Sequence, residues 1–257
     1  AILTIVRDIS KRKAAEKTIR EREKHLQELN AEKDKFFSII AHDLRSPFNA
    51  FLGYLQFLEE RFSKFSKDQI LEKITILRQS ANNLFSLLEN LLEWSHLQRG
   101  ITEFQPETIQ LSEVVDESVT FAREQAGQKD IELSAHIPET VQVKADRRML
   151  SAILRNLTSN AIKFTPGGGR VSIGADPSEG GRVKIYVQDT GIGMNEDMKN
   201  NLFRLDAKVN RPGTDGEAST GLGLLLCKEF IEKHGGTIQA ESRENEGTTF
   251  IFCLPAG

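Results

Sequence analysis

Two stretches in the first hundred residues carry the apolar spacing of a coiled coil, four and three residues apart. Such a seam predicts an α-helix that buries one stripe of its surface. Ser66 followed by Gln69 is a capping-box pattern, so we expect the second helix to begin there after a polar turn. The first seam consists of Ile40, Leu44, Pro47, Phe51, Tyr54 and Leu58, and the second of Ile70, Ile74, Leu77, Ala81, Leu84, Leu88 and Leu91.

The second helix also has another apolar face, formed by Leu71, Phe85 and Leu92. One helical hairpin cannot cover two faces, so we expect residues 36–98 to form a homodimer, with two hairpins building a four-helix bundle. Residues 11–35 are mostly charged helix formers. They indicate a short, imperfect coiled coil, and an isolated linker helix is the alternative.

After residues 99–100 the pattern changes to helices and strands mixed together. Consecutive hairpin-like strands beside grouped helices favour an α+β two-layer sandwich, which makes the chain multidomain. We expect helices at 112–127, 147–164, 196–203 and 221–234, and strands at 131–136, 141–145, 170–175, 183–188, 236–241 and 248–254.

Composition excludes several classes of protein. The net charge is −3, from 34 basic and 37 acidic residues, so nucleic acid is not an expected partner. The two cysteines, Cys227 and Cys253, lie in separate apolar runs without metal-ligand spacing. No stretch resembles a membrane span or a signal peptide, so we expect a cytoplasmic fragment without membrane contact.

His42 stands beside Asp43 in the first helix, five residues before the helix-breaking Pro47. Its helical neighbours are polar, which counts against a histidine of the core. We interpret His42 as a nucleophile on an exposed stripe, with Asp43 accepting its proton or holding its tautomer. Pro47 frees backbone groups near the histidine and bends the helix there. The stripe also contains Ser38, Arg45, Ser46 and Asn49.

Two glycine clusters suggest turns that approach anionic oxygens. VQDTGIGM places Asp189 at the end of a strand, followed by Gly191 and Gly193. STGLGLLLCKEF runs Gly221 and Gly223 into an apolar helix. Each Gly-x-Gly alone is more often a plain turn, and no P-loop or dinucleotide fingerprint is present. Phosphate binding would therefore need other chemistry.

The segment LRNLTSNAIKF repeats asparagine within a helix, at Asn156 and Asn160, with Lys163 on the same face. Asparagine is a poor residue for a helix interior, so its repetition four residues apart indicates a function. Amide oxygens suit Mg²⁺, which prefers oxygen ligands and accompanies phosphates.

Taken together, these blocks resemble the catalytic core of a two-component sensor histidine kinase, with a HisKA phosphoacceptor domain and a HATPase_c/GHKL domain of the Bergerat ATP-binding fold. The resemblance covers about residues 34–256 and keeps the order of the family. AHDLRSP is similar to the phosphoacceptor box, NLTSNAIKF to the asparagine box, DTGIGM and TGLGL to the two glycine boxes, and NLF at 201–203 to the phenylalanine box.

The resemblance implies an ATP-dependent autokinase that phosphorylates His42, with Asp43 as base, and passes the phosphoryl group to an aspartate of a response-regulator receiver domain. It also implies that Asn160, assisted by Asn156, holds Mg²⁺, that Lys163 meets a phosphate and that Asp189 receives the adenine amino group. Residues 205–219 would be a lid over ATP. The implied ATP-binding residues are Asn156, Asn160, Lys163, Phe164, Asp189, Gly191, Gly193, Phe203, Thr220, Gly221, Leu222, Gly223 and Leu224.

Some positions depart from the family pattern. Asp43 is shorter than the usual glutamate. Ser46 stands where threonine or asparagine usually positions water, so we expect weak phosphatase activity. Ser219 replaces a frequent glycine, and the start, IVRDISKRK, resembles the end of a PAS sensor domain with Ser10 in place of threonine. The expected divisions are a PAS-like tail (1–10), a linker (11–35), the phosphotransfer domain (36–100) and the ATP-binding domain (101–257).

Two other classes of function remain as alternatives. A stand-alone ATPase of the gyrase or chaperone type would share the asparagine and glycine boxes but would lack a seam helix with an exposed histidine. A dimeric scaffold without catalysis would be expected to lose Asn160 or Asp189, and both are present.

Overall fold

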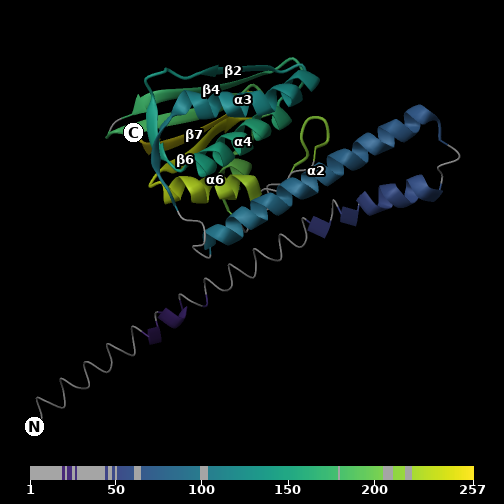
Figure 1. Cartoon of the computed structure of the whole chain (residues 1–257), viewed down its shortest axis with the longest axis horizontal. Coiled ribbons are helices and arrows are strands. Elements are labelled where there is room, and N and C mark those ends of the chain that lie inside the picture. Colours follow the sequence, from purple (N-terminus) through teal and green to yellow (C-terminus); the bar gives the residue numbers. More distant parts are fainter. Residues whose placement is uncertain are drawn as a thin grey trace, which may run out of the picture. The chain divides into compact units, whose positions relative to one another are not determined.

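A computed structural model describes residues 19–20, 22–24, 27, 44–45, 48–49, 51–60, 65–98, 104–178, 180–204, 211–217 and 222–257 (Figure 1). The chain divides into two compact units, residues 1–80 and 81–257.

Residues 51–60 are helical, and helix α2, Lys67–Gln98, follows them; we call these two segments the hairpin. The predicted capping box is present. The Ser66 N–H donates to Gln69 Oε1 over 3.0 Å, and the Gln69 N–H donates to Ser66 Oγ over 3.3 Å. Both groups would otherwise lack a partner at the helix start, so α2 begins where the sequence predicted. Although α2 has 32 residues, no helix in the described part of the chain is long and apolar enough to cross a membrane.

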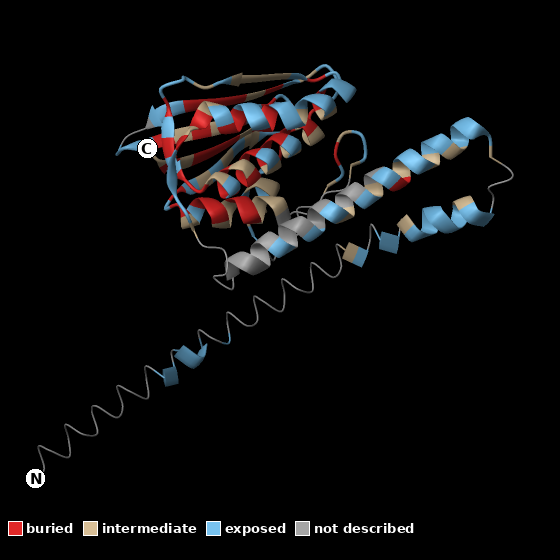
Figure 2. Ribbon diagram, viewed as in Figure 1, coloured by how far each residue is buried: buried red, intermediate tan, exposed pale blue. Residues whose placement is uncertain are grey.

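Much of the apolar surface of the hairpin faces solvent in the single chain, as the pale colour of these helices in Figure 2 indicates. Leu77 is buried. The exposed large apolar side chains include members of the predicted seams and of the second face: Phe48, Leu52, Tyr54, Leu55, Phe57, Leu71, Ile74, Phe85, Leu88 and Leu92. A surface of this kind marks an interaction site in a soluble protein.

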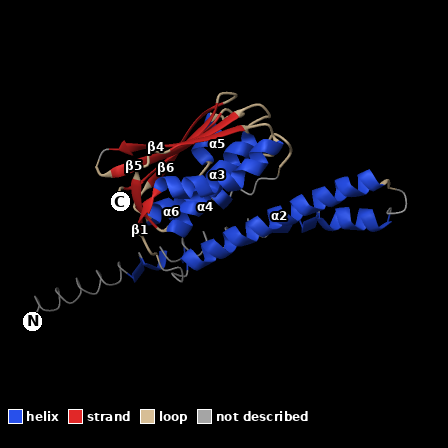
Figure 3. Ribbon diagram, turned by 45° about the horizontal axis from the view of Figure 1, so that its top comes forward, coloured by secondary structure: helices blue, strands red, loops and turns tan. Residues whose placement is uncertain are grey.

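The residues after α2 form a domain of two layers, a five-stranded sheet with helices packed on one face (Figure 3). The strand order is β2-β4-β5-β7-β6, and all neighbouring pairs are antiparallel except β2 and β4. The predicted α+β sandwich is confirmed. Its elements are α3 (Leu111–Gln128), β2 (Glu132–His136), α4 (Arg147–Phe164), β4 (Arg170–Ser178), β5 (Arg182–Asp189), α5 (Glu196–Asn201), α6 (Leu222–Lys233), β6 (Thr237–Arg243) and β7 (Gly247–Pro255).

A small second sheet was missed by the sequence analysis. Strand β1, Glu107–Gln110, pairs antiparallel with β3, Gln142–Ala145. Ile109 is the one apolar residue of β1, and a strand this short is defined by its distant partner more than by its own pattern. The expectation that successive strands pair as hairpins holds for β4–β5 and β6–β7 but is wrong for β2 and β3, which join different sheets.

Helix α4 is the centre of the core between helices and sheet. Leu150, Ile153, Leu154 and Leu157 on its inner face are fully buried. Each such side chain contributes about 1.5–3 kcal/mol when removed from water. Asp146 caps the helix by accepting the N–H groups of residues 148 and 149. The helix is thereby held rigidly, and its outer face can carry polar groups at fixed positions.

Candidate functional site

The polar face of α4 presents Asn156, Asn160 and Lys163, all half-buried, on the side away from the core. Their helical spacing places them in one row, as the sequence predicted. The side-chain Nδ2 of Asn156 donates to the Ala152 carbonyl oxygen over 3.0 Å. Its Oδ1 lies beside Gly223, where a Cβ would come within 2.5 Å of it. The row therefore faces the start of α6.

Asp189 ends β5 as a buried carboxylate, with 4% of its surface exposed. Its Oδ1 accepts the N–H of Gly191 over 2.8 Å and the N–H of Thr248 over 3.1 Å. Burial raises the pKa of Asp189 to about 6. The two N–H donors and the charge of Arg211 lower the pKa, but the effect of burial is larger. At neutral pH the group is a largely ionised, buried acceptor, suited to an amino donor of a ligand.

The turn after Asp189 needs glycine for space. Gly193 has φ +56, and a Cβ there would overlap the carbonyl oxygen of Arg243. A Cβ on Gly191 would overlap the carbonyl oxygen of Phe164, which accepts the Ile192 N–H over 3.0 Å. Close approach of backbone segments is a use for which only glycine fits. These contacts place the first glycine cluster at the C-terminal end of α4.

Residues 211–217 are the described part of the expected lid. The Arg211 guanidinium donates to the Gly193 carbonyl oxygen, and its Cζ lies 5.2 Å from the centre of the Phe164 ring. Lys163 Nζ lies 5.3 Å from the same ring centre. Two cations therefore lie beside one aromatic ring, and the charge of Arg211 also acts on Asp189. At these positions they would favour an anionic ligand.

Phe203 and Leu224 support the site from the core side, since both are half-buried and pack against the hydrophobic core. Phe203 follows α5, which ends at Asn201 and so is two residues shorter than predicted. Gly223 lies in the first turn of α6 next to Asn156. The start of α6 thus lies beside Asn156, and the first glycine cluster lies at the C-terminal end of α4, the helix of Asn156.

Comparison with known proteins identifies the family. Residues 145–257 match the model of the histidine kinase-, DNA gyrase B- and HSP90-like ATPases, and residues 32–100 match the His Kinase A phospho-acceptor domain. A solved catalytic domain of histidine kinase ThkA is 31% identical, with a TM-score of 0.51; the match covers 59% of this chain and 95% of that domain. The chain belongs to the histidine kinases.

Longer relatives are similar to nearly the whole chain, including the residues before the catalytic domain. An uncharacterized sensor-like histidine kinase of Rhizobium meliloti (strain 1021) is 33% identical over 258 residues, which is 100% of this chain and 49% of the relative. The structure of ThkA in complex with the response regulator TrrA is 26% identical with a TM-score of 0.64, covering 93% of this chain and 64% of that one. The chain spans about half or less of the length of its curated relatives.

Several predicted site residues of this histidine kinase lie outside the described residues: His42, Asp43, Ser46, Thr220 and Gly221. Leu222 begins α6, but its side chain is also outside the described part. Their roles stay predictions. The matched ATPase-type domain supports ATP binding, and the matched HisKA domain implies dimerisation.

Sequence reasoning missed three residues that the structure brings to this site: Lys129, Arg211 and Thr248. Thr248 was visible only as the first residue of a predicted strand, and its N–H reaches Asp189 from a distant part of the chain. Lys129 lies in the turn after α3 and Arg211 in an irregular segment, and neither segment has a periodic signal. Only tertiary contacts could identify them.

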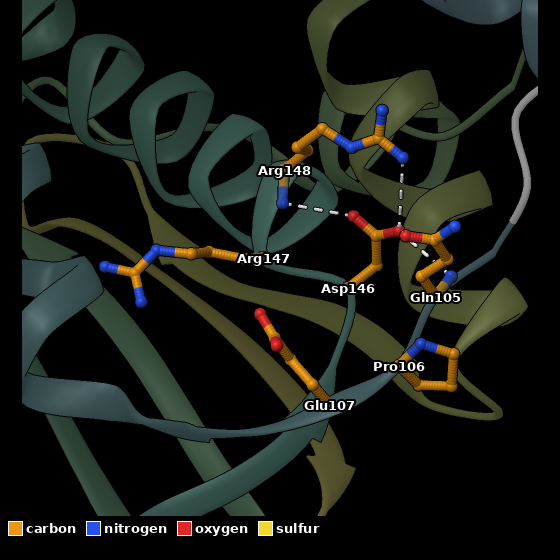
Figure 4. A pocket seen from close by; sticks show the side chains of 6 residues that line it. All are labelled: Gln105, Pro106, Glu107, Asp146, Arg147 and Arg148. Carbon is orange, nitrogen blue, oxygen red and sulfur yellow. Dashed lines mark hydrogen bonds and ion pairs between the residues drawn. The ribbon is translucent and has the colours of Figure 1, made fainter.

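A hollow of about 280 Å³ lies at the opposite, N-terminal end of α4 (Figure 4). The Asp146 carboxylate at its side accepts the N–H groups of Arg148 over 3.0 Å and Gln105 over 3.2 Å. Arg147 pairs with Glu113 and Glu117. These contacts are those of a helix cap, so we do not assign the nucleotide site to this hollow.

Proposed function

We propose that this histidine kinase binds ATP in the domain of residues 101–257, transfers the γ-phosphoryl group to His42, and passes it on to an aspartate of a response-regulator receiver domain. The observation that carries the proposal is the buried Asp189 carboxylate, which is hydrogen-bonded to the glycine turn that packs on the C-terminal end of α4, the helix with the asparagine row. A buried acceptor next to anion-favouring groups suits an adenine nucleotide.

In this proposal Asp189 accepts a hydrogen bond from the amino group of adenine, and Gly191 and Gly193 shape the site through their close backbone contacts. Phe164, Phe203 and Leu224 supply apolar contact. Lys163 meets a phosphate, and burial lowers the pKa of its ammonium to about 8, which still leaves it mostly charged at pH 7. The second glycine cluster, Thr220, Gly221, Leu222 and Gly223, would bring backbone N–H groups to the phosphates.

Asn160 and Asn156 are the residues that would hold Mg²⁺. The donor chemistry fits: both side chains offer amide oxygens on one half-buried face, and Mg²⁺ takes oxygen ligands together with phosphates and water. Among the described residues there is no cluster of three acidic, histidine or cysteine side chains that would favour another metal site. When bound, the ion would offset phosphate charge.

His42 is the proposed nucleophile. A nitrogen of its imidazole forms a bond to the γ-phosphorus while the bond to the oxygen of the ADP leaving group breaks, and the proton of the ring passes to Asp43. The N–P bond is then broken by a carboxylate of the receiver domain, which regenerates the imidazole. The ThkA structure with its response regulator supports a receiver domain as partner. Arg45 and Asn49, on the same predicted stripe, are exposed.

Homodimerisation through residues 36–98 is supported by the exposed apolar face of the hairpin and by the HisKA match. We further propose that residues 1–10 end a PAS-like domain and that residues 11–35 form a coiled-coil linker. We also propose that this fragment lies in the cytoplasm, where ATP is present.

The test is incubation of the full chain with γ-labelled ATP, followed by acid and by alkali. Phosphohistidine is expected, so the label should stay with the protein in alkali and leave it in acid. Release of labelled phosphate without protein labelling would identify a stand-alone ATPase, and absence of both would identify a non-catalytic scaffold. The HisKA match over residues 32–100 argues against a stand-alone ATPase, and the presence of Asn160 and Asp189 argues against a non-catalytic scaffold.

A further inference from the structure

A buried lysine outside the predicted boxes joins the lid segment to α4. Lys129 follows α3, and 7% of its side chain is exposed. Its Nζ donates to the carbonyl oxygens of Ile162 over 3.3 Å and Lys163 over 3.2 Å, to Thr214 Oγ1 over 2.7 Å and to Glu217 Oε1 over 2.9 Å. The Thr214 N–H also donates to the Lys163 carbonyl oxygen, over 3.0 Å. A buried ammonium is tolerated only when it is paired and hydrogen-bonded, as this one is.

Residues 213–217 form a closed turn of their own, which we call the lid turn. The Gly213 N–H donates to the Glu217 carbonyl oxygen over 2.8 Å. The Asp215 N–H donates to Glu217 Oε2 over 3.0 Å. The carboxylate of Glu217 therefore closes the lid turn with one oxygen and receives Lys129 with the other.

The lid turn forms one side of the surroundings of Lys163. A Cβ on Gly213 would lie 2.7 Å from Lys163 Cγ, so the turn packs against the aliphatic stem of the lysine. The ring of Phe164 lies on another side. Burial lowers the pKa of Lys163, the charge of Glu217 raises it, and the charge of Lys129 lowers it. The position and the charge of the Lys163 ammonium thus both depend on where the lid turn lies.

We propose that Lys129 is a positioning residue for ATP binding: it holds the lid turn on the C-terminal end of α4 and thereby fixes where the Lys163 ammonium meets the nucleotide phosphates. This inference rests on the role of Lys163 in the proposed function. Lys129 itself uses its N–H groups on protein acceptors and does not contact the nucleotide. A binding side chain must be held within about 0.5 Å of its productive position, so loss of the anchored lid turn should weaken the binding of ATP.

The first experiment compares Thr214→Val with Thr214→Ser in the full chain. Thr214→Val removes the hydroxyl with little change of shape, and Thr214→Ser keeps it. Thr214 Oγ1 accepts from Lys129 Nζ and also lies within hydrogen-bond distance of the carbonyl oxygens of Lys163, at 3.2 Å, and Thr165, at 3.0 Å. For Thr214→Val we expect faster hydrogen exchange of residues 211–217 and a KM for ATP raised about fivefold, with kcat changed by less than about twofold, because binding of substrate and transition state weaken together. Thr214→Ser should behave as wild type.

Lys129→Met should raise the KM for ATP by about tenfold, equivalent to about 1.4 kcal/mol. Lys144→Met makes the same chemical change at an exposed position of β3 and should leave the KM unchanged. Circular dichroism checks that Lys129→Met is folded, and the threonine pair keeps the test independent of that variant. Faster exchange in Thr214→Val with an unchanged KM would overturn the proposal, as would a loss confined to kcat.

A double-mutant cycle with Lys163→Met distinguishes the proposed role of Lys129 from the proposed phosphate contact of Lys163. If Lys129 acts through Lys163, Lys129→Met should add no further increase in KM to Lys163→Met. Additive effects would contradict a positioning role for Lys129. A normal KM for ATP in Lys163→Met would instead refute the proposed phosphate contact of Lys163, and the inference with it.

Discussion

The hairpin and the ATP-binding domain bury apolar residues in opposite ways. In the domain, residues of α4 such as Leu150 and Ile153 and of the sheet such as Ile185 are fully buried. In the hairpin, Phe85 is 61% exposed and Leu88 is also exposed. The ATP-binding domain completes its apolar core within a single chain, whereas the apolar side chains of the hairpin would be covered only by a second copy. The difference indicates that the nucleotide site needs one chain and that the phosphoacceptor helices need a second copy.

The largest expected effect separates the chemistry of the two regions. His42→Ala should abolish phosphate incorporation completely while ATP affinity stays unchanged, because the proposed nucleophile and the proposed nucleotide site lie in the separate regions matched by HisKA and by the ATPase model. Labelling with γ-labelled ATP and calorimetric titration with a non-hydrolysable ATP analogue measure the two quantities. Retained label, or weakened nucleotide binding, would break the division of roles.

Asn160→Ala changes the ATP-binding domain and leaves the phosphoacceptor region intact. We expect autophosphorylation to fall by about 100-fold or more, the scale of losing one group that stabilises transferring charge, because an amide oxygen for Mg²⁺ is lost. Asn160→Asp should also be inactive, since its added charge competes with the phosphates. The hairpin dimer should be unaffected, as checked by light scattering. A near-normal rate in Asn160→Ala would transfer the metal role to Asn156.

Leu88→Asp tests directly whether a second copy covers the apolar side chains of the hairpin. A charge in the predicted dimer seam should raise the dimer dissociation constant by about 100-fold, or about 2.7 kcal/mol. Phe121→Asp is the matched control, because Phe121 on α3 is 79% exposed, the most exposed of the described large apolar side chains. Sedimentation velocity at several concentrations gives both constants. Equal dissociation in the two variants would show that the exposed face of the hairpin is not the dimer interface.

The pH dependence of ATP affinity tests whether the domain site depends on Asp189. Burial raises the pKa of this carboxyl to about 6, so the ionised acceptor is present above pH 6 and is lost as the pH falls through 6. ATP affinity should therefore fall below pH 6, by up to about tenfold per pH unit. Asp189→Asn should bind ATP weakly at all pH values and lack this component. The same slope in Asp189→Asn would assign it to the protonation of ATP itself.

The smallest effect concerns Ser46, four residues after His42 in the predicted phosphoacceptor helix. A serine hydroxyl is shorter and less directional than an asparagine amide, so wild type should dephosphorylate a receiver domain slowly. Ser46→Asn and Ser46→Thr should raise that rate several-fold and change the autokinase rate less. The decay of a preloaded phospho-receiver, with kinase and ADP added, is the measurement. A fast wild-type decay that Ser46→Thr slows would contradict our interpretation of this position.

Local patterns were sufficient to predict most of the elements and one face of the site. The capping box of Ser66 and Gln69 marked the start of α2, and the apolar spacing of residues 147–164 predicted α4 with its correct ends. The asparagine row followed from the same periodicity. These features depend on residues within a few turns of one helix, where side-chain direction is determined by the backbone itself.

The sequence alone therefore determined the helical hairpin, the mixed domain, the histidine kinase boxes and the row of Asn156, Asn160 and Lys163. Tertiary structure decided the pairing of β1 with β3, the reach of Thr248 to Asp189, and the contact of Lys129 with Glu217, which lies 88 residues away in the chain. Such contacts form between segments with no common periodicity, because they depend on how the packed layers bring distant turns together and on the need of each buried charge for a partner.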